Sequence, residues 1–301
     1  MSNKLVGFVG LGNMGGRITR RLVNAGYTVL GYDSAPGRAE ACGAKVARSV
    51  AEVAKGADTI LLSLPDSSVV EAVVEDGLIA HARKGQVVVD LSTAAPGSTT
   101  RLATRFAERG ATYIDAGISG GAAAAEKGTL TLMVGGDKAS ADRLKDVFAP
   151  FSTKVVYMGA SGAGHTTKLL NNFLNAVSLS ATAEVMVAGK KAGLDLHLLL
   201  DVLNSSSGVN FATLNRFPKI VDGDYLEGGL TGKLMTKDVV LYVDCLHQLG
   251  VTSLNAAGPM ACFGLGTALG YGDQISNRVV DAIGDVSGGI RLQSSTGKGR
   301  K

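Results

Sequence analysis

The stretch GFVGLGNMGGRITRRL, residues 7–22, decides how the chain begins to fold. Its glycines Gly10, Gly12 and Gly15 follow the spacing G-x-G-x-x-G. The spacing alone is weak evidence, because the chain contains 41 glycines and chance matches are expected. A dinucleotide-binding turn also needs a strand before the glycines, a helix after them and an acidic residue about 20 positions on.

The surroundings of the glycines meet all three conditions. Residues 5–9 form an apolar run typical of a buried parallel strand, and residues 17–24 carry apolar side chains at helical spacing. A second apolar run ends in Asp33, 21 residues after Gly12. We therefore favour a dinucleotide-binding unit over a plain glycine turn.

Each glycine has a physical role in such a turn. Gly10 allows the tight turn, Gly12 lets the backbone approach a pyrophosphate, and Gly15 lets the helix pack closely on the strand. The helix N-terminus offers unpaired N–H groups to the phosphates. We expect the whole loop to bind the cofactor, namely Gly10, Leu11, Gly12, Asn13, Met14 and Gly15.

The acidic residue predicts which cofactor binds. Asp33 is placed to accept hydrogen bonds from the adenosine ribose 2′-OH and to repel a 2′-phosphate, which favours NAD over NADP. Arg38 follows five residues later, near enough in sequence to reach a 2′-phosphate. NADP therefore stays open as a second cofactor.

Composition excludes several classes of protein. The content of 46% hydrophobic and 19% charged residues is ordinary for a globular protein, and 301 residues predict two domains. The net charge of +4 comes entirely from four basic residues in the last 11, because the rest balances at 4 − 4 = 0. We predict a solvated, mobile basic tail over residues 291–301 and no nucleic-acid partner.

Other residue types bound the setting. Cys42, Cys245 and Cys262 lie far apart without a C-x-x-C pair, which is typical of reduced thiols in a cytoplasmic protein. The chain shows neither a basic-then-apolar leader nor 18 consecutive apolar residues, so neither secretion nor membrane insertion is predicted. The four histidines lack ligand spacing, so no metal site is expected.

Short apolar runs alternate with helical segments as far as residue 159. Strands are expected at 58–65, 85–93, 111–117, 129–136 and 154–159, and helices at 67–75, 97–109 and 139–149. This alternation predicts an α/β, Rossmann-like domain over residues 1–162, with a mostly parallel sheet covered on both faces. Ligands bind at the carboxyl ends of such strands, where the loops LPDS, LSTAAP and GISGG are expected.

The pattern changes after residue 162. Residues 163–191 contain no proline and predict one long interdomain helix, roughly 42 Å long and buried between other elements because it is apolar nearly all round. Residues 192–290 predict a helical C-terminal domain without strand pairs. Its apolar excess favours a homodimer or homotetramer formed through this domain.

The long helix carries the first candidates for chemistry. Lys168 and Asn172 lie four residues apart, so they share one helix face. A solvated surface pair is the alternative, but the helix dipole disfavours a cation in the first turns, so stability does not explain Lys168.

Two further candidates lie elsewhere in the chain. Lys237, which is followed by Asp238, is a second candidate for a functional lysine. The alternative is that the two residues form only a surface ion pair. The backbone of Ser119, Gly120 and Gly121 can hold a carboxylate, and the alternative is a plain turn before the next strand.

Five motifs occur in a characteristic order: GFVGLGNMG, DLSTAAPGS, DAGISGGAAAAEKGTLTLMVGG, GAGHTTKLLNN and LMTKD. They span residues 7–238. In these motifs the sequence resembles the β-hydroxyacid dehydrogenase family, which includes 3-hydroxyisobutyrate dehydrogenases and tartronate semialdehyde reductases. The resemblance implies an oxidoreductase that transfers a hydride between NAD(P) and a small β-hydroxy acid or its semialdehyde or ketone.

The resemblance also implies roles for residues at the cofactor. Thr93 would lie against the nicotinamide ribose, and Leu64 and Pro65 would line the cofactor groove. Lys237 would close over both cofactor and substrate.

At the substrate, the resemblance implies that Ser119, Gly120 and Gly121 hold the carboxylate. Lys168 would be the general acid/base, and Asn172 would orient the substrate. Because a free lysine has a pKa of about 10.4, burial or a neighbouring cation must lower the pKa of such a base.

Several alternatives stay open. His165 either touches the substrate, as the G-H-x-x-K run of 6-phosphogluconate dehydrogenases suggests, or only packs near the helix start. A small monocarboxylate fits best, whereas a phosphonate, sulfonate or phosphorylated substrate needs an extra basic residue. Arg101 and Lys127 lie near the right loops but are expected to be exposed. A non-catalytic cofactor-binding scaffold is expected to lose Lys168 or Asn172, and both are present.

Overall fold

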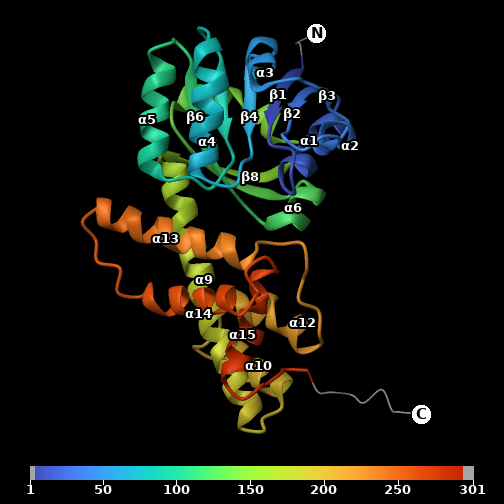
Figure 1. Cartoon of the computed structure of the whole chain (residues 1–301), viewed down its shortest axis with the longest axis vertical. Helices are drawn as coiled ribbons and strands as arrows, with labels where there is room; N and C mark the ends of the chain where they lie inside the picture. The colour runs from blue at the N-terminus through green and yellow to red at the C-terminus, as the bar shows by residue number, and fades with distance from the viewer. Residues whose placement is uncertain (1–3, 294–301) are drawn as a thin grey trace. The chain divides into compact units, whose positions relative to one another are not determined.

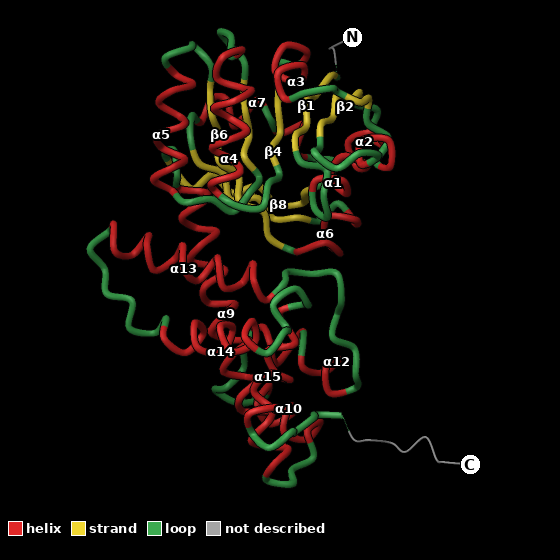
Figure 2. The backbone as a smooth tube through the Cα atoms, viewed as in Figure 1, coloured by secondary structure: helices red, strands yellow, loops and turns green. Residues whose placement is uncertain are grey.

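The computed structural model describes residues 4–293. The chain divides into two compact units, Met1–Leu169 and Leu170–Lys301. The division falls inside helix α9 (Ala163–Lys191), seven residues beyond the predicted end of the first domain at residue 162. Figure 2 shows the strands in the first unit and helices and loops in the second.

The first unit is built on one sheet of eight strands in the order β3-β2-β1-β4-β5-β6-β7-β8 (Figure 1). The strands are β1 (Leu5–Val9), β2 (Thr28–Tyr32), β3 (Lys45–Val46), β4 (Thr59–Leu62), β5 (Val87–Asp90), β6 (Thr112–Ser119), β7 (Leu130–Gly135) and β8 (Ser152–Gly159). Strands β1 to β6 are parallel, β7 is antiparallel to β6, and β8 is parallel to β7. The predicted mostly parallel sheet is thus confirmed.

Helices cover both faces of this sheet. One face packs against α3 (Val50–Gly56), α4 (Ser67–Val73) and α5 (Pro96–Ala107), which bury Val53, Val70 and Phe106. The other face packs against α1 (Gly15–Asn24), α2 (Arg38–Ala41), α6 (Gly121–Lys127), α7 (Lys138–Arg143) and α8 (Lys145–Phe148). The two apolar layers hold the strand ends, and hence the loops of the site, in place.

Local structure departs from the prediction at three places. The helix expected over 139–149 is broken into α7 and α8 at Leu144, whose side chain turns into the core. The helix expected over 67–75 continues as a π-helical turn (Val74–Leu78) and a 3₁₀ turn (Ile79–His81). Residues 119–121, expected to be a loop before the next strand, are the end of β6 and the start of α6.

The second unit is all-helical, as predicted. Besides its part of α9 it contains α10 (Leu196–Asn204), α11 (Phe211–Asn215), α12 (Phe217–Val221), α13 (Gly232–Gln248), α14 (Ala257–Ala268), a 3₁₀ turn (Ser276–Arg278) and α15 (Val279–Val286). Phe173 of α9 stacks on Tyr242 of α13 with ring centroids 3.7 Å apart. The expectation that α9 is buried between other elements holds only for part of its surface: Phe173, Leu179 and Met186 are buried, whereas Leu174 is 66% exposed and Val185 44% exposed.

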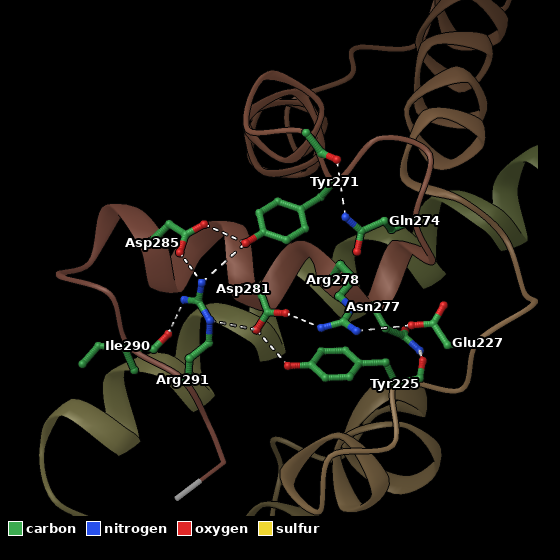
Figure 3. A network of polar contacts seen from close by, with 11 residues as sticks. Tyr225, Glu227, Tyr271, Gln274, Asn277, Arg278, Asp281, Asp285, Ile290 and Arg291 are labelled. Atoms are coloured by element: carbon green, nitrogen blue, oxygen red, sulfur yellow. Dashed lines mark hydrogen bonds and ion pairs between the residues drawn. The ribbon is translucent and has the colours of Figure 1, made fainter. Parts of the chain in front are cut away.

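A polar network surrounds α15 (Figure 3). The buried carboxylate of Asp281 accepts a hydrogen bond of 2.8 Å from the Tyr225 hydroxyl and one of 2.9 Å from Arg278. Burial, and then the bond to Asp281, raise the pKa of Tyr225 to about 12. Arg278 also stacks on the Tyr225 ring, 3.6 Å from its centroid.

The same network corrects the predicted start of the basic tail. Arg291 donates a hydrogen bond to Asp285 and lies 3.8 Å from Asp281, and Leu292 is buried in the helical core. Residues 291 and 292 therefore belong to the folded unit, because an ion pair and apolar burial hold them there. Residues 294–301 of the predicted tail lie outside the described residues.

Candidate active site

The glycine loop after β1 fits the backbone of a dinucleotide. Gly10 has a φ of +88°, and a Cβ there would lie 2.3 Å from the Ser63 carbonyl oxygen. A Cβ on Gly15 would lie 1.9 Å from the Gly10 carbonyl oxygen, so the turn and α1 touch backbone to backbone. Around Gly12, by contrast, the nearest atom to such a Cβ is the Arg38 Nη1 at 3.4 Å. The loop thus leaves room where a pyrophosphate must approach.

Sheet topology places this loop at the usual nucleotide position. Strand β1 lies between β2 and β4, so the order of strands reverses between β1 and β4. In open α/β sheets, ligands bind outside the carboxyl ends of the strands at such a reversal. Because β1, β4, β5 and β6 are parallel, the loops LPDS, LSTAAP and the residues after β6 lie at that same edge.

The predicted groove residues lie around the glycine loop. The Leu64 side chain reaches within 2.9 Å of a Cβ placed on Gly10, and its backbone N–H donates 2.9 Å to the Ser92 hydroxyl. Thr93, the next residue, is half-buried, and Pro65 is exposed. The structure therefore brings Leu64 to the glycines, while the cofactor contacts of Thr93 and Pro65 stay predictions.

Asp33 is held rigidly at the end of β2. Its Oδ2 accepts a hydrogen bond of 2.7 Å from Leu11 N–H, and its Oδ1 accepts one of 2.8 Å from Ala35 N–H. The Arg38 guanidinium lies 3.4 Å from both carboxylate oxygens. The backbone donors take one lone pair of each oxygen and Arg38 approaches the other, so a ribose hydroxyl would compete with Arg38 for Asp33.

A buried carboxylate holds the start of α9. Asp115 of β6 accepts 2.9 Å hydrogen bonds from the N–H groups of Gly162 and His165. The His165 ring is completely buried, with Nδ1 2.7 Å from the Thr99 hydroxyl and Nε2 3.2 Å from the Asp90 carbonyl oxygen. Of the two roles considered for His165, packing at the helix start agrees with this burial.

Asp90 links the same region to Tyr113. The Tyr113 hydroxyl donates 2.8 Å to Asp90 Oδ2, and burial followed by the Asp90 charge raises the pKa of Tyr113 well above 10. Sequence reasoning missed Asp90, Thr99, Tyr113 and Asp115. The sequence offered only a weak signal for the two aspartates, because Asp90 is the last residue of β5 whereas Asp115 lies within β6.

Lys168 packs directly against β6. A Cβ placed on Gly117 would lie 2.6 Å from the Lys168 Cβ and 3.1 Å from its Cγ. Ser119 follows two residues later on the same strand and so projects from the same face as Gly117. The structure therefore brings Lys168 to the strand that carries Ser119. Gly120 and Gly121 follow with φ values of 122° and 68°, and α6 begins at Gly121.

Asn172 and Lys237 meet at a buried carboxylate in the helical unit. The Asn172 amide donates to Asp238 Oδ2, and Asp238 is 1% exposed. The Lys237 ammonium lies 3.1 Å from Asp238 Oδ1. The ion pair expected as the alternative at Lys237 is present, but it is not a surface pair, because Asp238 is buried.

A second cation, Arg216, contacts α9 farther along the helix. Arg216 directly precedes α12 and donates a 3.0 Å hydrogen bond to Asn175 Oδ1 of α9 and a 2.7 Å bond to Asn277 Oδ1. Sequence reasoning missed Arg216, because it belongs to none of the five motifs. Arg101 and Lys127, which were considered instead, are exposed, and Arg101 pairs with Glu71 at 2.6 Å.

Residues 4–293 contain no cluster of three or more His, Cys, Asp or Glu side chains that could hold a metal ion. No helix in this range has the length and apolar content needed to cross a membrane. Cys42, Cys245 and Cys262 are free thiols, and the first two are buried.

Comparison with known proteins identifies the family. A family model described as the NAD binding domain of 6-phosphogluconate dehydrogenase matches residues 5–159, which is 155 of the 301 residues. A second model, described as NAD-binding of NADP-dependent 3-hydroxyisobutyrate dehydrogenase, matches residues 162–283. The chain belongs to the β-hydroxyacid dehydrogenase family. As a member, it is an NAD(P)-dependent oxidoreductase that acts on hydroxy acids.

Individual relatives cover most of this β-hydroxyacid dehydrogenase. It is 38% identical to an NAD-dependent L-serine dehydrogenase of Pseudomonas aeruginosa over 79% of the chain and 84% of the relative. It is 32% identical to a 2-(hydroxymethyl)glutarate dehydrogenase of Eubacterium barkeri over 94% and 96%. The structure of Mycobacterium tuberculosis 3-hydroxyisobutyrate dehydrogenase with L-serine matches with a TM-score of 0.81 and 30% identity, covering 92% of this chain and 97% of that chain.

The packing of Lys168 on Gly117 gives a testable consequence. A methyl group in Gly117→Ala would sit 2.6 Å from a Cβ that cannot rotate away, so Lys168 must shift. We expect turnover to fall about 10²-fold while NAD binding is retained, because small displacements of a reacting group have effects of this size. Steady-state kinetics and calorimetric titration with NAD measure the two quantities.

Gly264→Ala is the matched control, because no atom lies within 4 Å of a Cβ at that position. Undiminished turnover in Gly117→Ala would show that the position of Lys168 does not matter.

Proposed function

We propose that this enzyme transfers a hydride between NAD and a small β-hydroxy acid, with Lys168 as the general acid/base. The observation that carries the proposal is the packing of Lys168 on β6 at Gly117, two residues before Ser119. A lysine there can exchange a proton with a hydroxyl whose carboxylate is held by the residues after β6. The glycine loop and Asp33 lie at the same edge of the same sheet.

The residues of the glycine loop, with Leu64, Pro65 and Thr93, would hold the cofactor. When bound, the nicotinamide supplies or accepts the hydride. The chain itself must then orient the substrate and move the matching proton. The N–H groups at Gly120 and Gly121 and the Ser119 hydroxyl suit a carboxylate, because consecutive backbone N–H groups form an anion-binding concavity.

Lys168 would manage the proton. In the direction of reduction its ammonium gives a proton to the oxygen that gains negative charge, and in the direction of oxidation its amine removes the hydroxyl proton. Asn172 would orient the substrate, and the bond from its amide to Asp238 fixes the asparagine rotamer. Lys237, beside the same carboxylate, would close over cofactor and substrate.

The relatives support a β-hydroxy acid as substrate. Their names refer to L-serine, 3-hydroxyisobutyrate and 2-(hydroxymethyl)glutarate. In each of these compounds, the carbon that bears the hydroxyl is bonded directly to the carbon that bears the carboxylate. Sulfonate, phosphonate or phosphorylated analogues are a second class, which a further cation near the substrate would favour. A cofactor-binding scaffold without activity is not supported, because the chain belongs to a family of dehydrogenases and carries both Lys168 and Asn172.

Replacement of Lys168 tests the proton step. We expect Lys168→Ala to lose roughly 10²- to 10⁴-fold in kcat with unchanged NAD affinity, because general acid–base groups contribute rate enhancements of this order. The assay follows NADH absorbance with a panel of small hydroxy acids and their semialdehydes. Lys145→Ala is the control, because Lys145 is 69% exposed and pairs with a surface aspartate. Full activity in Lys168→Ala would refute the assignment.

Asp33 and Arg38 make opposite contributions to cofactor choice. We expect the wild-type protein to bind NAD about tenfold or more tighter than NADP, because Asp33 is fixed by two backbone N–H groups and repels a 2′-phosphate. Asp33→Asn should remove most of this preference, since Arg38 remains to attract the phosphate. Calorimetry with both cofactors measures it, with Asp58→Asn, an 87% exposed carboxylate, as the control. Tighter binding of NADP by the wild type would contradict the proposal.

We further infer that the enzyme forms a homodimer or homotetramer through its helical unit. Among the described residues, sixteen of the twenty exposed large apolar side chains lie beyond residue 169. A hollow of about 300 Å³ between α9 and α14 is lined by Val177, Leu254, Pro259 and Cys262, and Leu254 is 81% exposed. The three free thiols support a reducing compartment, for which we propose the cytoplasm.

Charge placed on the apolar surface tests the assembly. We expect the wild type to sediment with the mass of at least two chains and Leu254→Glu to sediment as a single chain, because a buried carboxylate at an interface is costly. Because the Leu254 side chain is exposed in the single chain, we expect the Leu254→Glu chain to remain folded after dissociation, with a cooperative melting transition. A wild type that sediments as one chain at micromolar concentration would contradict the inference.

A further inference from the structure

The arginines of the helical unit differ in whether a carboxylate pairs with them. Among its described residues the unit has three, and two of them pair with carboxylates (Figure 3). Arg278 pairs with Asp281 at 2.9 Å and with Glu227 at 3.4 Å, and Arg291 pairs with Asp285. The third, Arg216, has no carboxylate within ion-pair distance in the described part of the chain.

The partners of Arg216 are neutral. One terminal nitrogen donates 2.7 Å to Asn277 Oδ1 and the other donates 3.0 Å to Asn175 Oδ1. The guanidinium also lies over the Phe211 ring, 5.8 Å from its centroid. These contacts use two of the five N–H donors of a guanidinium and neutralise none of its charge.

Arg216 is half-buried, and the desolvation of its guanidinium makes this arrangement costly for a purely structural residue. Desolvation lowers the pKa of the Arg216 guanidinium to about 10, so the group remains charged at neutral pH. A buried charge is normally paired, and an apolar side chain of similar size often replaces a buried charge without loss of stability. An unpaired arginine is therefore best explained by a negative charge that arrives with a ligand.

Position along α9 indicates which ligand. Asn175 follows Asn172 by three residues, about 4.5 Å along the helix axis, and follows Lys168 by seven. Residues at these spacings share one face of a helix. Arg216 is thus anchored to α9 one turn beyond the asparagine assigned to substrate orientation.

We propose that Arg216, held by Asn175 and Asn277, forms a subsite for a second carboxylate at the far end of the substrate. The physiological substrate class is then a β-hydroxy dicarboxylic acid. The guanidinium fork binds a carboxylate through two parallel N–H donors, which gives both charge neutralisation and orientation. The inference rests on the proposed function, because it takes Asn172 to contact the substrate.

Two substrates that differ only in the second carboxylate provide the test. They are 2-(hydroxymethyl)succinate and 3-hydroxyisobutyrate, assayed with NAD and the full-length enzyme. We expect the wild type to favour the dicarboxylate in kcat/KM. Arg216→Gln should lower kcat/KM for the dicarboxylate at least tenfold and for the monocarboxylate less than threefold, because a hydrogen bond to a charged group is worth about 1.5–3 kcal/mol.

Lys219→Gln is the matched control. Lys219 lies on α12, three residues after Arg216, is exposed, and loses the same charge in this variant. We expect both substrates to be turned over at wild-type rates in this variant, so any effect of Arg216→Gln is local and not due to net charge.

A binding measurement separates the subsite from catalysis. The melting temperature of each protein is recorded with succinate, glutarate or butyrate as the probe, without cofactor. We expect the two dicarboxylates to stabilise the wild type and Lys219→Gln more than butyrate does, and to lose this advantage in Arg216→Gln. A wild type stabilised equally by glutarate and butyrate would overturn the proposal without any variant.

The remaining outcomes are distinguishable. Equal losses for both substrates in Arg216→Gln would show that Arg216 only joins α9 to the Ser276–Arg278 turn, and the subsite would be refuted. If no hydroxy acid is oxidised but dicarboxylate stabilisation depends on Arg216, the proposed function fails and the anion subsite stands. If 3-hydroxyisobutyrate is oxidised and Arg216→Gln matches the wild type throughout, the function stands and the subsite fails.

Discussion

The buried carboxylate of Asp115 is the group on which the candidate active site depends. It accepts the N–H groups of Gly162 and His165, two donors that the start of α9 cannot pair within the helix. Its negative charge also lies at the positive end of the helix dipole. Because Asp115 belongs to β6, this contact fixes the first turn of α9 to the strand that leads to Ser119. Lys168 follows His165 by three residues, so the position of its backbone is set by the same contact.

In the α/β unit, backbone segments approach each other closely at two places, the start of α9 and the glycine loop before α1. A Cβ on Gly164 would lie 2.3 Å from the Met133 carbonyl oxygen, and one on Gly117 would strike Lys168. The glycine loop has the same character, since Gly10 and Gly15 touch through their backbones. At both places a helix begins almost in contact with strand backbone, which brings its N-terminal N–H groups and its first side chains to the strand ends. Helix starts of this kind suit anionic ligands.

The sequence predicted those parts of the molecule whose signals are local. The glycine spacing with its flanking strand, helix and Asp33, and the proline-free span of α9, depend on neighbours within about 30 residues, and the structure contains both. The reversal of β7 relative to β6 could not be predicted, because an apolar run does not encode the direction of its partner. Arg216 was missed for a related reason: its partners Asn175 and Asn277 are 41 and 61 residues away. Arg291 was assigned to a tail because its acidic partners precede the segment considered.

The electrostatics of the helical unit distinguish structural charges from functional ones. Arg278 and Arg291 form ion pairs with carboxylates of the same unit, and these pairs stabilise α15 and the chain after it. The buried carboxylate of Asp238 accepts a hydrogen bond from Asn172 and forms an ion pair with Lys237, which neutralises its charge. Arg216 donates instead to two amide oxygens, which orient the guanidinium without cancelling its charge. Amide oxygens hold a cation ready for an anion that is not part of the chain, because a protein carboxylate in the same place would compete with the ligand. The neutral side chains of Asn175 and Asn277 therefore leave the positive charge of Arg216 available to a negatively charged ligand.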